Sequence, residues 1–198
     1  MNYRGSLGYG EKFQEIDYKD LGGGDYQDII TGVDYLVNKG IADPEQLFIR
    51  GSSYGGFLTA WAICHTNRFK AAIVESGITD WISDIATTDA PTTMEEYFGG
   101  AYWDDYELWR KTSPIRYVAH IKTPTLFLQG GSDERVTTGQ SKQLYNALKS
   151  NKIPTRLVFY NEQGHSFDSS VAARDAINET LTWMKTYGAE AKKEKQVR

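Results

Sequence analysis

The segment from Gly51 to Gly55 has the pattern G-x-S-x-G, centred on Ser53. Such a pattern places a serine on a sharp turn between a strand and a helix, where small flanking residues let the two elements approach closely. The N-terminus of the helix favours negative charge near the hydroxyl. An apolar run precedes the motif and a helix-compatible run follows it. We therefore predict Ser53 as a nucleophile; a glycine-rich turn that happens to hold serine is the alternative.

A serine nucleophile needs a base, and the sequence has three histidines. His165 directly follows the last apolar run, in a loop at the sheet edge where we also expect Ser53, and it is our candidate base. His65 lies in the helix after the serine, and His120 lies in a loop that leads into a strand. We interpret both of these as structural residues.

The base in turn needs an orienting carboxylate, for which we favour Asp133 because it follows the end of an apolar run. An ordinary turn aspartate is the alternative interpretation. Glu134 is adjacent but is expected to point elsewhere, and Asp168 is close in sequence to His165. The resulting chain order of serine, aspartate and histidine is typical of α/β-hydrolases.

These residues predict acyl transfer by an activated serine. His165 takes the proton of Ser53 as the hydroxyl attacks a carbonyl, and Asp133 fixes the tautomer and stabilises the charged form of the ring. The backbone N–H of Tyr54 is expected to donate to the oxyanion. Water then hydrolyses the acyl-enzyme.

Alternating strands and helices must position these residues, which indicates an α/β fold. Four short runs are nearly continuous in apolar character, as in strands of a parallel sheet that helices cover on both faces. They lie at residues 47–49, 71–74, 125–128 and 157–160. Helical patterns lie between and after them, at residues 25–39, 55–65, 138–150 and 171–187.

Two of these helices carry more specific expectations. Asp25 is predicted to cap the first one, which Gly40 ends. The last one is predicted to bury one face, formed by Ala176, Ile177, Leu181 and Met184.

The segment 79–118 is rich in Trp, Tyr, Asp and Thr, and we expect short helices and loops inserted over the carboxyl edge of the sheet. We predict one domain over residues 1–188, followed by a charged, disordered tail at 189–198.

Composition narrows the classes of function. The 198 residues carry a formal charge of −4, with no basic block before the last residues, so we expect no nucleic-acid partner. No apolar run approaches the length of a membrane span, and the first 15 residues are polar, so we expect no membrane association and a cytoplasmic location. The single cysteine, Cys64, closes no internal disulfide, and we predict neither a metal site nor a cofactor.

With these residues in view, the chain resembles the catalytic domain of the prolyl oligopeptidase family of serine peptidases. The nearest branch is the acylaminoacyl-peptidase and dipeptidyl-peptidase group. The motifs that carry the resemblance follow the family's order: residues 2–6, 8–10, 25–28, 51–56, 77–81, 113–115, 123–126, Asp133 with Val136, and 164–167.

The resemblance implies Ser53, Asp133 and His165 as the catalytic residues. It also implies that Tyr54, Ile78, Trp81 and Val136 surround the pocket for the substrate side chain before the scissile bond. For the last three residues, core packing remains an equal alternative, because an apolar pocket and an apolar core look alike in sequence.

Four further residues bear on this comparison. We interpret Arg135 as a solvated surface residue in preference to a substrate ligand, and Arg4 as a charge partner of Asp25 or Asp28. Gln129 and Thr137 stand where the family usually has histidine and proline. We expect neither of these two departures to touch the candidate triad.

Members of this family usually carry a β-propeller, several strands and a glycine-rich oxyanion loop before the point that matches the start of this sequence. The resemblance therefore implies a truncated α/β-hydrolase fold, in which the nucleophile strand is an open edge and one oxyanion donor is missing. Because an apolar edge strand promotes association, we hypothesise that it pairs with a second copy, giving a homo-oligomer, or with a missing fragment.

Two functions follow from the residues and the resemblance. The leading one is a serine hydrolase that acts on peptides, as an acylaminoacyl- or dipeptidyl-peptidase, or on small esters. The alternative is a catalytically weak remnant of a hydrolase that serves as an interaction or assembly module. Thiol chemistry needs cysteine at the nucleophile turn, and Ser53 occupies that position.

Overall fold

A parallel sheet of four strands forms the centre of the computed structural model, which describes residues 2–188. The strands are β1 (Phe48–Ser52), β2 (Ala71–Glu75), β3 (Thr125–Gly130) and β4 (Thr155–Tyr160), and they pair in chain order. All six residues of β3 and the first four of β2 are buried. Two of the four apolar runs thus become central strands covered on both faces, and the other two become the terminal strands, which confirms the predicted α/β architecture.

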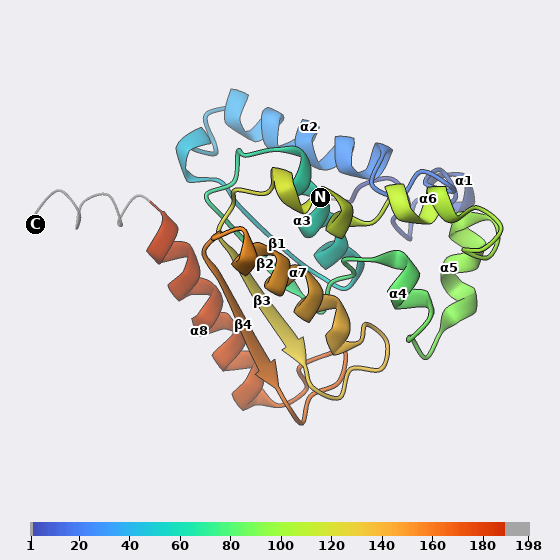
Figure 1. Ribbon diagram of the computed structural model, residues 1–198. Coiled ribbons are helices and arrows are strands. Elements are labelled where there is room, and N and C mark those ends of the chain that lie inside the picture. Colours follow the sequence, from blue (N-terminus) through green and yellow to red (C-terminus); the bar gives the residue numbers. More distant parts are fainter. Residues whose placement is uncertain (1, 189–198) are drawn as a thin grey trace, which may run out of the picture.

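Helices cover the two faces of this sheet (Figure 1). On one face, α3 (Tyr54–His65) and α7 (Thr138–Ser150) bury Ile63, Leu144 and Leu148 against Ala72, Val74 and Phe127. On the other face, α8 (Ser170–Tyr187) packs against Ile73, Leu126 and Leu128. Outside these layers, α2 (Gly24–Asn38) lies against α3. The two faces receive alternate residues of each strand, as a pleated strand requires.

Residues 79–118 form short helices beyond the carboxyl end of β2. The 3-10 helix η2 (Pro114–His120) lies against α3 and α7. The other three, α4 (Trp81–Ile85), α5 (Pro91–Phe98) and α6 (Tyr106–Lys111), gather at one end of the molecule (Figure 1). Buried aromatic rings join them: Phe98 stacks on Trp109 at a centroid distance of 3.8 Å and meets Trp81 edge-on. Two other short turns, α1 (Glu11–Gln14) and η1 (Pro44–Gln46), complete the elements of the described residues.

The predicted cap of the first long helix is wrong. Helix α2 begins at Gly24, with Gly23 in the cap position, and Asp25 lies inside its first turn. The Asp25 side chain is wholly buried and, besides the Tyr26 N–H inside the helix, it accepts hydrogen bonds from Gly22 and Tyr54 outside it. A short polar side chain at a helix start is typical of a cap, and only the tertiary packing shows this different use.

The buried face of α8 is also only partly as predicted. Ala172, Ala176 and Thr180 are buried, whereas Ile177 and Leu181 are 51% and 49% exposed. The helix therefore turns its small residues toward the sheet, which allows the backbone of α8 to approach the strands closely. Two large apolar side chains are left at the surface.

Strand β1, which leads to Ser53, is a terminal strand of the sheet among the described residues. Its pairing with β2 runs from Phe48 opposite Ala71 to Ser52 opposite Glu75. The predicted open edge is thus present, while the predicted pairing through it stays a prediction. The predicted tail at 189–198 lies outside the described residues. Within residues 2–188, no helix is both long enough and apolar enough to cross a membrane.

Candidate active site

The turn between β1 and α3 holds Ser53 in a strained backbone conformation, with φ 58° and ψ −121°. A non-glycine residue rarely adopts positive φ, and such strain persists only where the surroundings enforce it. The Ser53 N–H donates to the carbonyl of Glu75 over 3.0 Å, which ties the turn to β2. A Cβ atom at Gly51 would lie 2.1 Å from the Gly55 carbonyl oxygen, so this first glycine permits the close approach of strand and helix.

The side chains of Ser53, His165 and Asp133 form one hydrogen-bonded chain. His165 Nε2 lies 2.9 Å from Ser53 Oγ, and His165 Nδ1 lies 3.0 Å from Asp133 Oδ2 and 3.1 Å from Asp133 Oδ1. The three residues follow the carboxyl ends of β1, β4 and β3, which meet at one edge of the sheet. With its proton on Nδ1, the ring donates to Asp133 and accepts from the serine hydroxyl, as a general base would.

Asp133 is 5% exposed and accepts hydrogen bonds from its own loop. The N–H groups of Arg135 and Val136 donate to Oδ1 over 3.0 and 2.9 Å. Burial opposes ionisation of the Asp133 carboxyl, but the hydrogen bonds from His165 and the Val136 N–H outweigh it and lower the Asp133 pKa. Asp133 therefore remains a carboxylate that can hold the ring of His165 in one tautomer.

Gln129, which we expected not to touch the triad, contacts it. Its wholly buried side chain donates from Nε2 to Asp133 Oδ2 over 3.1 Å and to the carbonyl of Val136 over 3.0 Å. Ser141 Oγ donates to Gln129 Oε1 over 2.6 Å. The prediction was wrong because residue 129 is the last but one in β3 and its side chain reaches the Asp133 turn, which spacing alone does not reveal. For Thr137 the prediction agrees with the structure, since its hydroxyl meets that of Thr87.

A pocket of about 320 Å³ lies beside Ser53 and His165. It is lined by Ser53, Tyr54, Ile78, Trp81, Asp84, Thr88, Ala90, Thr93, Met94, Arg135, Val136 and His165. The structure thus brings the four residues that the resemblance placed around a pocket to one cavity. Ile78, Trp81 and Val136 also belong to the hydrophobic core, so the two alternatives for these residues coexist.

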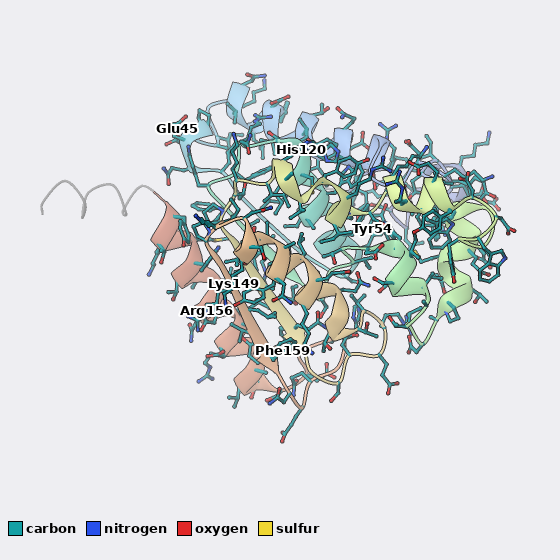
Figure 2. The ribbon with its side chains drawn as sticks, viewed as in Figure 1. Glu45, Tyr54, His120, Lys149, Arg156 and Phe159 are labelled. Carbon is teal, nitrogen blue, oxygen red and sulfur yellow. The ribbon has the colours of Figure 1, made fainter. Side chains whose placement is uncertain are left out.

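Tyr54 contributes to the site through its backbone and its ring. It is the first residue of α3, so its N–H belongs to the first helical turn, where N–H groups have no partner within the helix. The ring lies inside the molecule near α4, packed on Phe57 and Trp81 (Figure 2). Its hydroxyl donates to Asp25 Oδ2 over 2.6 Å.

Asp84 is the residue of this pocket that sequence reasoning missed. It is 4% exposed, on α4, three residues after Trp81. Burial, followed by the charge of Asp133, raises the Asp84 pKa to about 7. No motif marks this aspartate, and only its distance of one helical turn from Trp81 places the two side chains on the same side of α4.

The two arginines lie near the surface. The Arg135 side chain is 54% exposed, and its Nε–H donates to Asp89 Oδ1 over 2.5 Å, in agreement with a surface residue. Arg135 also lines the pocket. Arg4 forms a two-pronged pair with Asp28, through Nε and Nη2 over 2.8 and 2.6 Å. Arg4 is therefore a charge partner of Asp28, one of the two predicted choices.

The remaining histidines and the cysteine, whose side chains could also take part in chemistry, lie away from Ser53 in structural positions. His65 ends α3, with Nδ1 2.8 Å from the Trp61 carbonyl oxygen and its ring packed on Trp61. His120 is the last residue of η2, and the chain then leads into β3, as we predicted. Cys64 is buried, and burial raises the pKa of its thiol. Within residues 2–188, no group of three or more metal-binding side chains is arranged to hold a metal ion.

Fold and site together define an α/β-hydrolase domain, and comparison with known proteins specifies the family. The model of the prolyl oligopeptidase family matches residues 1–190, and the chain belongs to that family. An uncharacterized peptidase of Bacillus subtilis, YuxL, is 36% identical over 180 residues, which cover 89% of this chain and 27% of the relative. The acylamino-acid-releasing enzyme of Arabidopsis thaliana is 31% identical, over 94% of this chain and 26% of the enzyme.

Solved structures agree with this assignment. A puromycin-hydrolyzing peptidase of Mycobacterium tuberculosis superposes with a TM-score of 0.90 and 31% identity, covering 95% of this chain and 29% of that one. The acylaminoacyl peptidase of Pyrococcus horikoshii superposes with a TM-score of 0.85 and 30% identity, covering 94% and 30%. The chain therefore spans about a quarter to a third of the length of the relatives it matches.

Proposed function

We propose that the protein is a serine hydrolase that cleaves acylaminoacyl or dipeptidyl bonds of peptides, or small esters, through an acyl-enzyme on Ser53. The observation that carries this proposal is the continuous chain from Ser53 Oγ through the His165 ring to Asp133, built on a strained turn. A hydroxyl, a base and an orienting carboxylate in this geometry are the groups that acyl transfer by serine requires.

In the first half of the reaction, Ser53 Oγ attacks the substrate carbonyl carbon as His165 Nε2 takes the hydroxyl proton. The carbonyl oxygen becomes an oxyanion, to which the Tyr54 N–H donates. When the tetrahedral intermediate collapses, the leaving amine or alcohol takes the proton from Nε2 and the acyl group remains on Ser53. In the second half, water gives its proton to Nε2 and attacks the acyl carbon, after which Ser53 recovers its proton and the acid is released.

Asp133 supports both halves without giving up its charge. The carboxylate holds the Nδ1–H tautomer and stabilises the imidazolium that forms twice in each cycle. The hydrogen bonds that lower the Asp133 pKa keep it ionised beside a positively charged ring. A neutral amide at this position would favour the opposite tautomer, in which Nε2 carries the proton and cannot accept one from Ser53.

The substrate class is supported by the relatives. Those whose printed names state an activity are acylamino-acid-releasing enzymes, dipeptidyl-peptidases and puromycin-hydrolyzing peptidases. The pocket beside Ser53 has room for one substrate side chain, and small-molecule pockets begin at about this volume.

The experiment that tests this function compares turnover of N-acetyl-aminoacyl p-nitroanilides, dipeptidyl p-nitroanilides and p-nitrophenyl acyl esters. We expect Asp133→Asn to lower kcat by about 10³–10⁴ on every cleaved substrate, as for other triads that lose the carboxylate. The matched control is Glu134→Gln, which removes the adjacent exposed carboxylate and should leave kcat unchanged. Equal activities of the two variants, or no turnover of any substrate by the wild type, would contradict the proposal.

The open edge of β1 favours a second candidate function, that of an assembly module. Among the described residues β1 has a strand neighbour on one side, and an apolar groove of about 500 Å³ lies beside it. The groove lining includes Tyr3, Ile29, Val33, Ile49 and Leu58. If this edge pairs two copies, light scattering should give a dimer mass that Ile49→Lys converts to a monomer mass, whereas Ser53→Ala should not change it. A wild-type monomer at all concentrations would rule out this pairing.

A further inference from the structure

Helix α4 contributes one acidic side chain, Asp84, to the wall of the pocket beside Ser53. Its Oδ1 atom is buried, and no hydrogen-bond partner for it exists among residues 2–188. A buried carboxylate oxygen without a partner is unfavourable, since burial removes the water that would otherwise solvate it. The folded chain thus keeps, next to the nucleophile, an acceptor that its own residues do not satisfy.

Much of the rest of the wall is apolar. Ile78, Trp81, Val136 and Met94 are apolar, and the indole N–H of Trp81 is likewise buried without a partner in the described part of the chain. Arg135 is the one arginine or lysine among the described lining residues, and its guanidinium pairs with Asp89. A partly apolar wall that carries one acid suits a long aliphatic side chain that ends in a cation.

We propose that Asp84 is a specificity-determining residue, which makes the pocket favour substrates whose side chain before the scissile bond is lysine-like. The ammonium group would donate to the carboxylate of Asp84, and the aliphatic stem would lie along Ile78, Trp81 and Val136. This proposal rests on the proposed hydrolase function, since it names the substrate side chain for that reaction.

The charges around Asp84 give this preference a pH dependence. Asp133 after β3 and Asp80, which caps the start of α4, disfavour ionisation of Asp84, and His165 after β4 favours it when protonated. Arg135, which lines the pocket, pairs with Asp89, so the charges of these two side chains largely neutralise each other. Because burial and these charges raise the Asp84 pKa to about 7, the empty pocket carries a mixture of neutral and ionised Asp84 near neutral pH. A cationic side chain selects the ionised form, so the preference increases as pH rises from 6 to 8.

Matched substrates on the full 198-residue chain test the proposal. N-acetyl-lysine and N-acetyl-norleucine p-nitroanilides have the same stem and differ by the terminal ammonium. At pH 8 we expect kcat/KM to be at least tenfold higher for the lysine substrate, and Asp84→Asn to reduce this ratio at least tenfold. Glu134→Gln, at an exposed position, should leave the ratio unchanged. A wild type that prefers norleucine, or an unchanged ratio in Asp84→Asn, would overturn the proposal.

A binding measurement separates this inference from the hydrolase function and does not require turnover. In NMR titrations at pH 8, n-pentylammonium should bind the wild type at least tenfold more tightly than 1-pentanol does. Asp84→Asn should lose this difference, and lowering the pH to 6 should reduce it in the wild type. Equal affinities of the two ligands for the wild type would overturn the assignment of Asp84 whether or not the protein is active. If the wild type bound n-pentylammonium more tightly than 1-pentanol but cleaved no substrate, the result would count against the hydrolase function alone.

Discussion

The hydroxyl of Tyr54 donates a hydrogen bond to Oδ2 of Asp25 over 2.6 Å, and this contact links the residue after the nucleophile to the start of α2. Asp25 is wholly buried and also accepts from the N–H groups of Gly22 and Tyr26. Burial raises the Asp25 pKa, whereas these hydrogen bonds oppose the rise. Helix α2 thus carries a buried carboxyl that fixes the Tyr54 ring against the pocket.

We predict that Tyr54→Phe lowers the free energy of unfolding by about 1–3 kcal/mol, because it leaves a buried carboxyl oxygen without its donor. The oxyanion donor is the backbone N–H, so turnover should fall by less than about tenfold. Chemical denaturation and steady-state kinetics would measure the two effects. Tyr35→Phe, at an exposed tyrosine, is the control and should change neither. An unfolding free energy equal to that of the wild type would contradict this use of Asp25.

Two adjacent glycines in α3 should respond in opposite ways to alanine. A Cβ atom at Gly55 meets nothing within 4 Å, whereas one at Gly56 would lie 2.6 Å from Gly77 Cα and 2.8 Å from the Glu75 carbonyl oxygen. Gly55→Ala should therefore cost nothing and gain up to about 1 kcal/mol from helix propensity. Gly56→Ala should destabilise the fold by about 1–3 kcal/mol or more, through overpacking against backbone. Thermal unfolding of both variants checks this; equal effects would contradict the packing.

Removing the donor that Gln129 gives to Asp133 should slow catalysis. In Gln129→Leu, Asp133 Oδ2 loses the bond from Nε2, and the carboxylate is less firmly held. Since a hydrogen bond to a charged group contributes about 1.5–3 kcal/mol, we expect kcat to fall about tenfold or more while KM changes little. Gln143→Leu, at a half-buried glutamine of α7 without contact to Asp133, is the matched control. A selective increase of KM would show that Gln129 acts on substrate binding instead.

The Asp84 carboxyl should make stability depend on pH in a definite direction. Its pKa is raised from the usual 3.8 to about 7 in the folded protein, mainly by burial. Between these two values the folded protein holds a proton that the unfolded chain has released, so the free energy of unfolding falls as pH rises. The full loss is on the order of 4 kcal/mol and is complete above about pH 7.

Asp84→Asn removes this titration, and the variant should therefore gain stability relative to the wild type as pH rises from 4 to 8. The measurement is urea denaturation of both proteins at pH 4, 6 and 8, in which all other titrating groups cancel in the difference. A difference between the two proteins that stays constant across this range would show that Asp84 is not held neutral by the fold.

The sequence predicts those features of the fold and the site that depend on a short local pattern of residues. The apolar run 125–128 is β-branched or aromatic in part and too short for a helix, so β3 follows from local pattern. Ser53, Asp133 and His165 each follow such a run, and parallel strands bring their carboxyl ends to one edge. The proximity of the three side chains could therefore be predicted once the strands were taken to be parallel.

Prediction from the sequence fails where a polar side chain is satisfied by a distant part of the chain. Asp25 has the sequence context of a helix cap, and its partner Tyr54 is 29 residues away. Gln129 has the context of a buried strand end, and its polar partners lie in the following loop and in α7. Asp84 has no local signal, because its importance comes from the burial that the inserted helices create around it.

The most direct test of the central claim, that Ser53 is an activated nucleophile, is labelling with a fluorophosphonate followed by intact-mass measurement. We expect the wild type and Ser52→Ala to gain one phosphonyl group, and Ser53→Ala and His165→Gln to gain none, with circular dichroism showing that all four are folded. Absence of labelling in a folded wild type, or labelling that persists in Ser53→Ala, would contradict the account, since the hydroxyl beside His165 would then not be the reactive group.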